Sequence, residues 1–232
     1  MTGLPLKGVL FHYPPRAALN RNVPKARILA GAKVRRGLRD RLTAELAQIV
    51  WASKLATVSL NLPASAEVAE IQVFRLTLKP DVADVGEPVL RALDQAIPSP
   101  ILFEVQGDPG IKTVAAYKRP SEADAGKWVL GDYLRGDWLP IDASRQPLPV
   151  ALDMAGLYRE LMRALIPLPP RAGESLREQL ERLSAARAAE RECARLENQL
   201  NGETQFNRKV EINRLLREAR HTLQSTRAAY AG

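Results

Sequence analysis

The stretch EPVLRALDQAIPSPILFEVQGDPGIKTVAAYKR, residues 87–119, predicts a helix, a strand, a turn and a returning strand in direct succession. Pro88 stands at a favourable first helical position, and Leu93 and Ile97 follow it on one apolar face. The apolar runs PILFEV and IKTVAAYKR flank the turn sequence QGDPG. Residues 100–119 are therefore predicted to form a β-hairpin directly after the helix.

The patterns on both sides of this stretch extend the mixture of helices and strands. Before it, the sequence predicts a helix that places Leu38, Leu42, Leu46 and Ile49 on one apolar face, followed by strands at residues 57–62 and 69–79. After it, the sequence predicts a strand pair or a single bent strand within residues 127–140, and then a helix at residues 152–166 that Asp153 caps. Each strand has an apolar face that a helix must cover. The sequence therefore predicts an α+β fold, with a small mixed or antiparallel sheet covered by helices.

A proline-rich stretch divides the chain. Residues 167–175 read PLPPRAGES, and three prolines with a glycine neither continue a helix nor join a central strand. We therefore predict an α+β body over residues 1–166, a linker over residues 167–175 and a separate helical region over residues 176–232.

The helical region carries two apolar stripes of the kind that forms a coiled-coil seam. The first stripe consists of Leu176, Leu180, Leu183, Cys193, Leu196 and Leu200, and the second of Val210, Ile212, Leu216, Ala219, Leu223 and Tyr230. Asn201 and Gly202 stand between them and supply a helix stop. This pattern favours two antiparallel helices folded on one another. A single long helix, or a dimeric coiled coil kinked at Gly202, is the alternative.

The basic charge is concentrated near the amino end. Residues 1–55 contain 11 Lys and Arg against 2 acidic residues, residues 56–169 contain 11 against 15, and residues 170–232 contain 12 against 9. The densest part is KARILAGAKVRRGLRDR, residues 25–41. A cluster of this density can neutralise phosphates, so it predicts a contact with DNA through Lys25, Arg27, Lys33, Arg35, Arg36 and Arg39. A solvated helix face is the alternative.

Composition and motifs exclude several other classes of protein. No apolar run approaches the roughly 18 residues of a membrane helix, and a lone cysteine is typical of the reducing cytoplasm, so we expect a cytoplasmic protein. His12, His221 and Cys193 are too few for an ordinary zinc site or a positioned nucleophile and base. No glycine-rich phosphate-binding motif is present. We therefore expect no metal and no cofactor.

One enzymatic alternative stays open, a metal-dependent nuclease. Such an enzyme needs two carboxylates and a lysine near adjacent strands, and Asp94, Glu104 and Lys118 have roughly this order. Glu104 and Lys118, however, lie on different predicted strands instead of two residues apart on one. An ion pair at a sheet edge is the competing interpretation.

Five polar residues interrupt the second helix of the tail near its start: Gln205, Asn207, Arg208, Lys209 and Asn213. One interpretation is that the Gln and Asn side chains hydrogen-bond helix ends or, as buried amides, fix the register of the two packed helices. The other is contact with a partner or with phosphate, in which Arg208 and Lys209 present charge.

The same stretch carries a family resemblance. ETQFNRKVEIN, residues 203–213, resembles a signature near the end of the bacterial and archaeal family known as domain of unknown function 4391. Other segments resemble that family in the same order, over about residues 20–216: VPKARIL at residues 23–29, IVWASKLATVSLNL at 49–62, IPSPILFEV at 97–105 and AAYKR at 115–119. QFNRKVEIN is the most specific of them.

The resemblance implies a context and no mechanism. Members of the family are often encoded beside DNA helicases and DNA methyltransferases in defence or restriction-like loci, and no catalytic residues are assigned in it. It therefore implies a non-catalytic accessory or scaffold subunit of an anti-phage defence system, docked to a DNA helicase or DNA methyltransferase. The five polar residues of the tail would then contact that partner, and the basic amino-terminal segment would face DNA.

Overall fold

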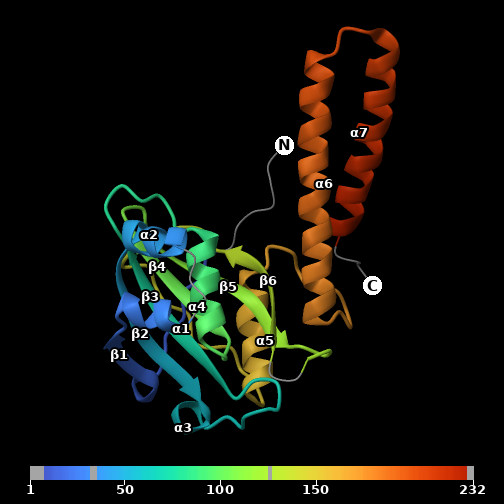
Figure 1. Ribbon diagram of the computed structural model, residues 1–232. Coiled ribbons are helices and arrows are strands. Elements are labelled where there is room, and N and C mark those ends of the chain that lie inside the picture. The colour runs from blue at the N-terminus through green and yellow to red at the C-terminus, as the bar shows by residue number, and fades with distance from the viewer. Residues whose placement is uncertain (1–7, 32–35, 125–126, 229–232) are drawn as a thin grey trace. The chain divides into compact units, whose positions relative to one another are not determined.

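The computed structural model describes residues 8–31, 36–124 and 127–228 (Figure 1). These residues form two compact units, which follow one another in the chain between Leu165 and Ile166. The first unit contains a mixed sheet with its helices, and the second contains a pair of long helices.

Six strands among the described residues form one sheet in which the strand order follows the chain. The strands are β1 (Ala18–Asn22), β2 (Leu46–Ala56), β3 (Glu70–Leu78), β4 (Ile101–Gly107), β5 (Gly110–Pro120) and β6 (Trp128–Arg135). Neighbours are antiparallel except β3 and β4, which run parallel. The helix α4 (Glu87–Ala96) joins this parallel pair, as a parallel connection requires. The predicted α+β fold with a mixed sheet is confirmed.

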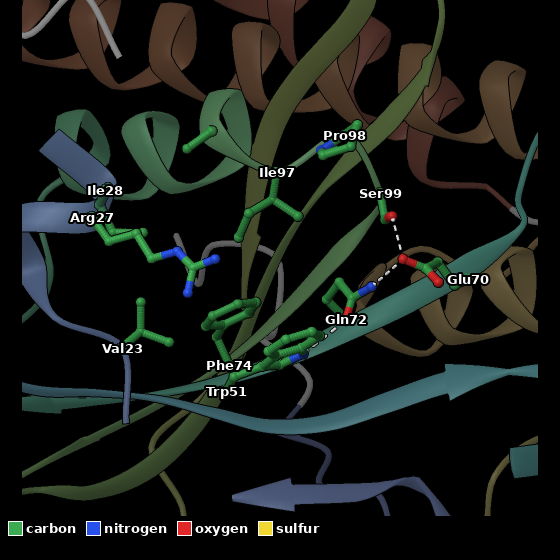
Figure 2. A pocket seen from close by; sticks show the side chains of 11 residues that line it. Val23, Arg27, Ile28, Trp51, Glu70, Gln72, Phe74, Ile97, Pro98 and Ser99 are labelled. Atoms are coloured by element: carbon green, nitrogen blue, oxygen red, sulfur yellow. Dashed lines mark hydrogen bonds between the residues drawn. The ribbon is translucent and has the colours of Figure 1, made fainter. Parts of the chain in front are cut away.

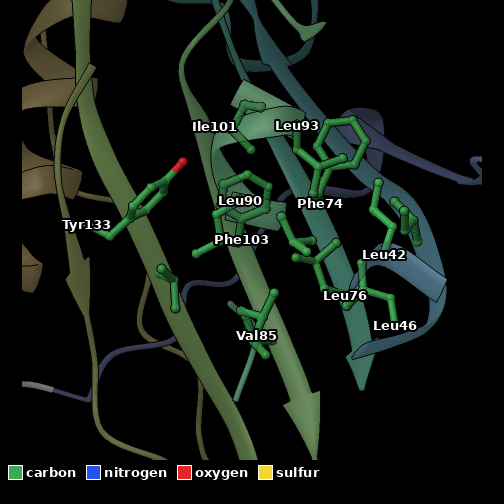
Figure 3. Close-up of a cluster of buried hydrophobic side chains, with 14 of the residues drawn as sticks. Leu42, Leu46, Phe74, Leu76, Val85, Leu90, Leu93, Ile101, Phe103 and Tyr133 are labelled. Carbon is green, nitrogen blue, oxygen red and sulfur yellow. The ribbon is translucent and has the colours of Figure 1, made fainter. Parts of the chain in front are cut away.

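Helices cover both faces of the sheet. The main core lies under α1 (Lys25–Gly31), α2 (Arg36–Glu45) and α4, whose apolar residues pack on alternate residues of β2 to β5. Figure 3 shows Leu90 and Leu93 of α4 against Phe74 and Phe103 of the sheet. The helix α5 (Met154–Leu165) lies against β3 and β5 on the other face, where Tyr158 stacks on Tyr117. The connections contain the short elements η1 (Pro15–Ala17) and α3 (Thr57–Leu60).

The local patterns of residues 69–119 were interpreted correctly. The predicted strand corresponds to β3, the helix begins with Pro88 in its first turn, and the hairpin is β4 and β5. Gly110 has φ +130°, and a Cβ there would lie 2.0 Å from the main-chain oxygen of Leu139. Only glycine fits this turn.

The region after this hairpin also follows the predictions. Residues 127–140 contain the single strand β6 and no second strand beside it, which settles that alternative. Asp153 caps α5 as predicted, because its Oδ1 accepts a hydrogen bond of 2.6 Å from the Gly156 N–H.

Two predictions before β3 were wrong. Leu46 and Ile49 do not continue a helix, since α2 ends at Glu45 and both residues belong to β2. A register shift after Leu46 places the two side chains, three residues apart, in the same core cluster. A β-bulge thus imitates helical spacing in the sequence.

Residues 57–62 form no strand. Thr57–Leu60 is the helical turn α3, Val58 is 90% exposed, and Asn61 ends the turn with φ 57°. The Ser59 hydroxyl accepts from the Ala56 N–H and donates to the Lys54 main-chain oxygen, both at 2.9 Å. Local side-chain hydrogen bonds therefore prevail over the alternating pattern.

The second unit is the predicted helical hairpin. Helix α6 (Leu176–Gly202) contacts α7 (Phe206–Arg227), and the ion pairs Arg220–Glu197 and Arg227–Glu190 show that the two helices are antiparallel. The chain reverses after Gly202, so the single-helix alternative is wrong. Ser175 and Glu178 form a capping box at the start of α6.

The buried seam of the hairpin differs in part from the predicted stripes. The apolar residues of the two helices that are buried are Leu176, Leu183, Ala186, Ala189, Cys193, Leu196, Leu216 and Leu223. Val210 is 51% exposed and takes no part, and Tyr230 lies outside the described residues. The segment 167–175 packs on α6, where Gln179 donates to the Leu168 main-chain oxygen and Arg182 pairs with Glu174 at 2.6 Å.

The Tyr158 hydroxyl of α5 forms hydrogen bonds to the main chain of β5 at the place where the pairing of β5 with β6 shifts register. It accepts a hydrogen bond of 2.8 Å from the Lys118 N–H and donates one of 3.1 Å to the Ala116 main-chain oxygen. Tyr158→Phe leaves both buried groups unpaired. We expect the variant to lose about 1–3 kcal/mol of unfolding free energy in urea denaturation.

Tyr13→Phe is the matched control for this prediction. The Tyr13 hydroxyl is buried and has no hydrogen-bond partner within the described residues. Its removal is expected to be neutral or stabilising. Equal losses in the two variants would contradict the bridging role of Tyr158.

Candidate functional site

The predicted DNA-contacting residues divide into three groups. Arg27 and Arg39 are exposed and make no side-chain hydrogen bond or ion pair within the described residues. Lys25 has a structural contact, since its Nζ donates to the Leu46 main-chain oxygen. Its burial and the nearby charge of Lys79 lower the pKa of Lys25. Lys33 and Arg35 lie outside the described residues, as does the side chain of Arg36.

The polar residues of the hairpin are gathered at its tip, and they face solvent. Gln205, Asn207, Arg208, Lys209 and Asn213 are all exposed. None of them is therefore a buried amide that fixes helix register, and that interpretation was wrong.

The bend of the hairpin and its buried polar contacts depend on residues other than these five. Glu203 stabilises the bend, because its Oε1 accepts from the main-chain N–H groups of Thr204 at 2.8 Å and Gln205 at 2.9 Å. Gln179 is a buried amide of α6, and it holds the segment before that helix by donating to the Leu168 main-chain oxygen at 2.8 Å. The sequence analysis also missed Phe206, which is 77% exposed beside the tip amides.

The structure separates Glu104 from Asp94 and Lys118, the other two residues of the nuclease alternative. Glu104 pairs in register with Thr113, and Lys118 lies five residues further along β5, so that the two side chains are on opposite faces of the sheet. Both oxygens of the buried Glu104 carboxylate are held by Arg145, and Arg75 lies 3.5 Å away. Within the described residues, no group of three or more His, Cys, Asp and Glu side chains is arranged to hold a metal ion.

Lys118 and Asp94 form a structural network at the end of α4. Lys118 Nζ donates to the main-chain oxygens of Asp94, Ile97 and Ser99, and burial lowers its pKa. Tyr133 donates to Asp94 Oδ2 at 2.5 Å, while Asp94 Oδ1 lies 4.0 Å from Lys118 Nζ. Burial raises the pKa of Asp94 to about 6 despite these partners.

A pocket that the sequence analysis did not predict lies on the α4 side of the sheet. Its volume is about 340 Å³, and α1, β2, β3 and the segment after α4 line it. Figure 2 shows Arg27 on one side of the neighbouring rings of Trp51 and Phe74, with Gln72 and Ser99 on the other side. A concave apolar site with a few convergent polar groups is the usual form of a small-molecule site.

The polar wall of this pocket is a connected hydrogen-bond network. Trp51 Nε1 donates to Gln72 Oε1 at 2.8 Å, and Gln72 Nε2 donates to Glu70 Oε1 at 2.7 Å. Ser99 Oγ donates to the same Glu70 oxygen at 3.2 Å, and Lys54 Nζ lies 2.5 Å from Glu70 Oε2. These residues come from three separate parts of the chain. The sequence analysis predicted no strand at Trp51, so the neighbouring positions of Trp51 and Gln72 could not be foreseen.

The chain belongs to the family described as domain of unknown function DUF4391, whose model matches residues 11–223. This match confirms the resemblance seen in the sequence. No curated protein and no solved structure is significantly similar to the chain. None of the described helices has the length and apolar character needed to cross a membrane.

Asp94 predicts a pH dependence of stability. Its pKa of about 6 in the folded protein is above its ordinary value of 3.8, so the folded state binds more protons between these values. This contribution to stability is present at low pH and is lost as pH rises from about 4 to 6. Asp94→Asn stays neutral and keeps an oxygen for Tyr133. We expect the unfolding free energy of the variant, relative to wild type, to rise by up to about 3 kcal/mol from pH 4 to pH 7.

Urea denaturation at several pH values measures this difference. Asp132→Asn, at an exposed position of β6, controls for the loss of one charge. A difference for Asp94→Asn that is constant over the pH range would show that burial does not raise the pKa of Asp94.

Proposed function

We propose that this DUF4391 member is a non-catalytic accessory subunit of a bacterial DNA-transacting assembly of the anti-phage defence or restriction-like type. The hairpin tip docks a larger enzyme, a DNA helicase or a DNA methyltransferase. The observation that carries the proposal is the exposure of the tip residues, which include the segment most specific to the family. The class of partner comes from the gene context that the family resemblance implies.

The tip surface has the composition of a protein interface. We define it as Gln205, Phe206, Asn207, Arg208, Lys209, Val210 and Asn213. Phe206 and Val210 are four residues apart and therefore lie side by side on α7, with exposures of 77% and 51%. An exposed aromatic anchor with arginine and amides around it is typical of a binding hot spot.

Most of the tip surface lies outside the contacts that hold the hairpin together; Arg208 is the exception, since its Nε lies 3.7 Å from Glu203 Oε2. The seam is closed by buried residues such as Leu196, Leu216 and Leu223, and the bend is held by Glu203. A hollow of about 360 Å³ beside Arg208, lined also by Glu211 and Ile212, offers a place for a partner side chain. The exposed side chains of Phe206 and Val210 are thus available for recognition.

DNA contact is the second part of the proposal. Arg27 and Arg39 are exposed cations without partners in the described residues, which leaves them available to phosphates. Such contacts favour any sequence equally, since they neutralise the backbone. They suit an accessory subunit that keeps a catalytic partner on DNA.

If the tip surface docks a partner, a negative charge introduced at Phe206 should weaken the binding of that partner. Tagged wild-type protein purified from its native locus at low salt is expected to retain the helicase or methyltransferase, identified by mass spectrometry. Phe206→Asp should reduce the retained partner at least tenfold, because it removes the apolar anchor and leaves a charge in the interface. Val150→Asp, at a position that is 96% exposed in the other unit, should retain it. A protein that purifies alone, or equal retention in both variants, contradicts the proposal.

DNA contact predicts a dependence on salt. The association constant for duplex DNA should fall linearly with salt concentration on a double logarithmic scale. Arg39→Gln should reduce the slope by about 1, because one phosphate contact is lost. Arg16→Gln, an exposed arginine outside residues 25–41, should leave the slope unchanged. An affinity that does not depend on salt would exclude phosphate contacts through this segment.

A further inference from the structure

We propose that the pocket between α1, β2, β3 and the end of α4 binds a nucleotide. The phosphate lies at Arg27, and the base lies against Trp51 and Phe74 with its polar edge toward Gln72 and Ser99. This proposal does not depend on partner docking or on duplex DNA, since the pocket is complete within the first unit.

The charge of the pocket selects an anion at one end. Arg27 lines the pocket and has no side-chain partner within the described residues, and Figure 2 shows its guanidinium directed into the pocket. Glu70 does not oppose this charge, because Lys54 lies 2.5 Å from its Oε2. The pocket therefore has one cation in excess. A guanidinium is well suited to phosphate, which it can hold with two parallel hydrogen bonds.

The middle of the pocket suits a flat ring. Trp51 and Phe74 lie side by side on paired positions of β2 and β3, with ring centroids 6.2 Å apart and planes that differ by 2°. The two rings are therefore parallel to one another, and Ile97 and Pro98 line the pocket above them in Figure 2. Bases stack well on surfaces of this kind because every base has a π-face. The volume of about 340 Å³ is that of a small-ligand site.

The far end of the pocket selects a ring with a polar edge. The Gln72 amide has a fixed orientation, because Trp51 donates to its oxygen while its nitrogen donates to Glu70. One Nε2 hydrogen of Gln72 then has no acceptor within the described residues, and Gln72 is only 3% exposed. The Ser99 hydroxyl oxygen keeps lone pairs that can accept. A nucleobase edge offers matching acceptors and donors, whereas a hydrocarbon ring leaves these groups unpaired.

Isothermal titration calorimetry with AMP, GMP, CMP and UMP, and with the four corresponding nucleosides, tests the assignment. We expect saturable binding of at least one monophosphate with one site per chain. Arg27→Gln should weaken this binding about tenfold or more and leave the binding of the matching nucleoside unchanged, because only the phosphate contact is removed. Arg39→Gln is the matched control, an exposed arginine of the same basic segment that does not line the pocket. It should change neither.

Two results would overturn the proposal. One is the absence of saturable binding by any of the four monophosphates up to 10 mM, roughly the weak end of specific binding. The other is an equal loss of affinity in Arg27→Gln and Arg39→Gln, which indicates general attraction to a basic surface. Trp51→Leu gives a second measurement, since it should weaken the nucleoside and the monophosphate by the same factor.

A single-stranded tetranucleotide with a 5′-phosphate distinguishes two sources of the nucleotide. Tighter, Arg27-dependent binding of this oligonucleotide than of the monophosphate assigns the pocket to an end of a nucleic acid strand. Arg27-dependent binding of the monophosphate alone assigns it to free nucleotides. Either result supports a nucleotide site.

Discussion

A buried ammonium group holds the end of α4 in place, and much of the first unit depends on it. Lys118 reaches from β5 to three main-chain oxygens at and after the last turn of the helix. Carbonyl groups at a helix end have no partner within the helix, and a cation stabilises them. The same contacts fix the path of residues 97–99, which form one wall of the pocket. A lysine that the sequence offered as a candidate nuclease residue thus holds one wall of the pocket in place.

The carboxylates of the body show why charged residues in sequence order are a weak sign of catalysis. Glu104 and Asp94 are buried, yet each is held by neighbours that the sequence places far away: Arg145 follows Glu104 by 41 residues, and Tyr133 follows Asp94 by 39. Buried charges need such partners, because their transfer from water is costly. The order Asp, Glu, Lys therefore reflects two separate structural networks on opposite faces of the sheet.

Local periodicity predicted the elements whose packing is regular. β3, α4, the β4–β5 hairpin, α5 and the α6–α7 hairpin were each predicted from their apolar patterns, and each is present in the structure. The failures have identifiable causes: a β-bulge in β2 gave Leu46 and Ile49 helical spacing, and the hydrogen bonds of Ser59 turned residues 57–60 into a helix. The pocket was beyond prediction because its walls come from residues 23–28, 51, 70–74 and 96–99. Only the density of cations drew attention to Arg27.

The length of α6 has an electrostatic consequence. Its 27 residues rise about 40 Å, at about 1.5 Å per residue, between the capping box of Ser175 and Glu178 and the bend at Gly202. Fields of exposed charges decay over about 8 Å at physiological ionic strength. The charges of Arg208 and Lys209 at the tip therefore have little effect on the other end of the hairpin. Mutations can change these two charges without weakening the ion pair of Arg182 with Glu174.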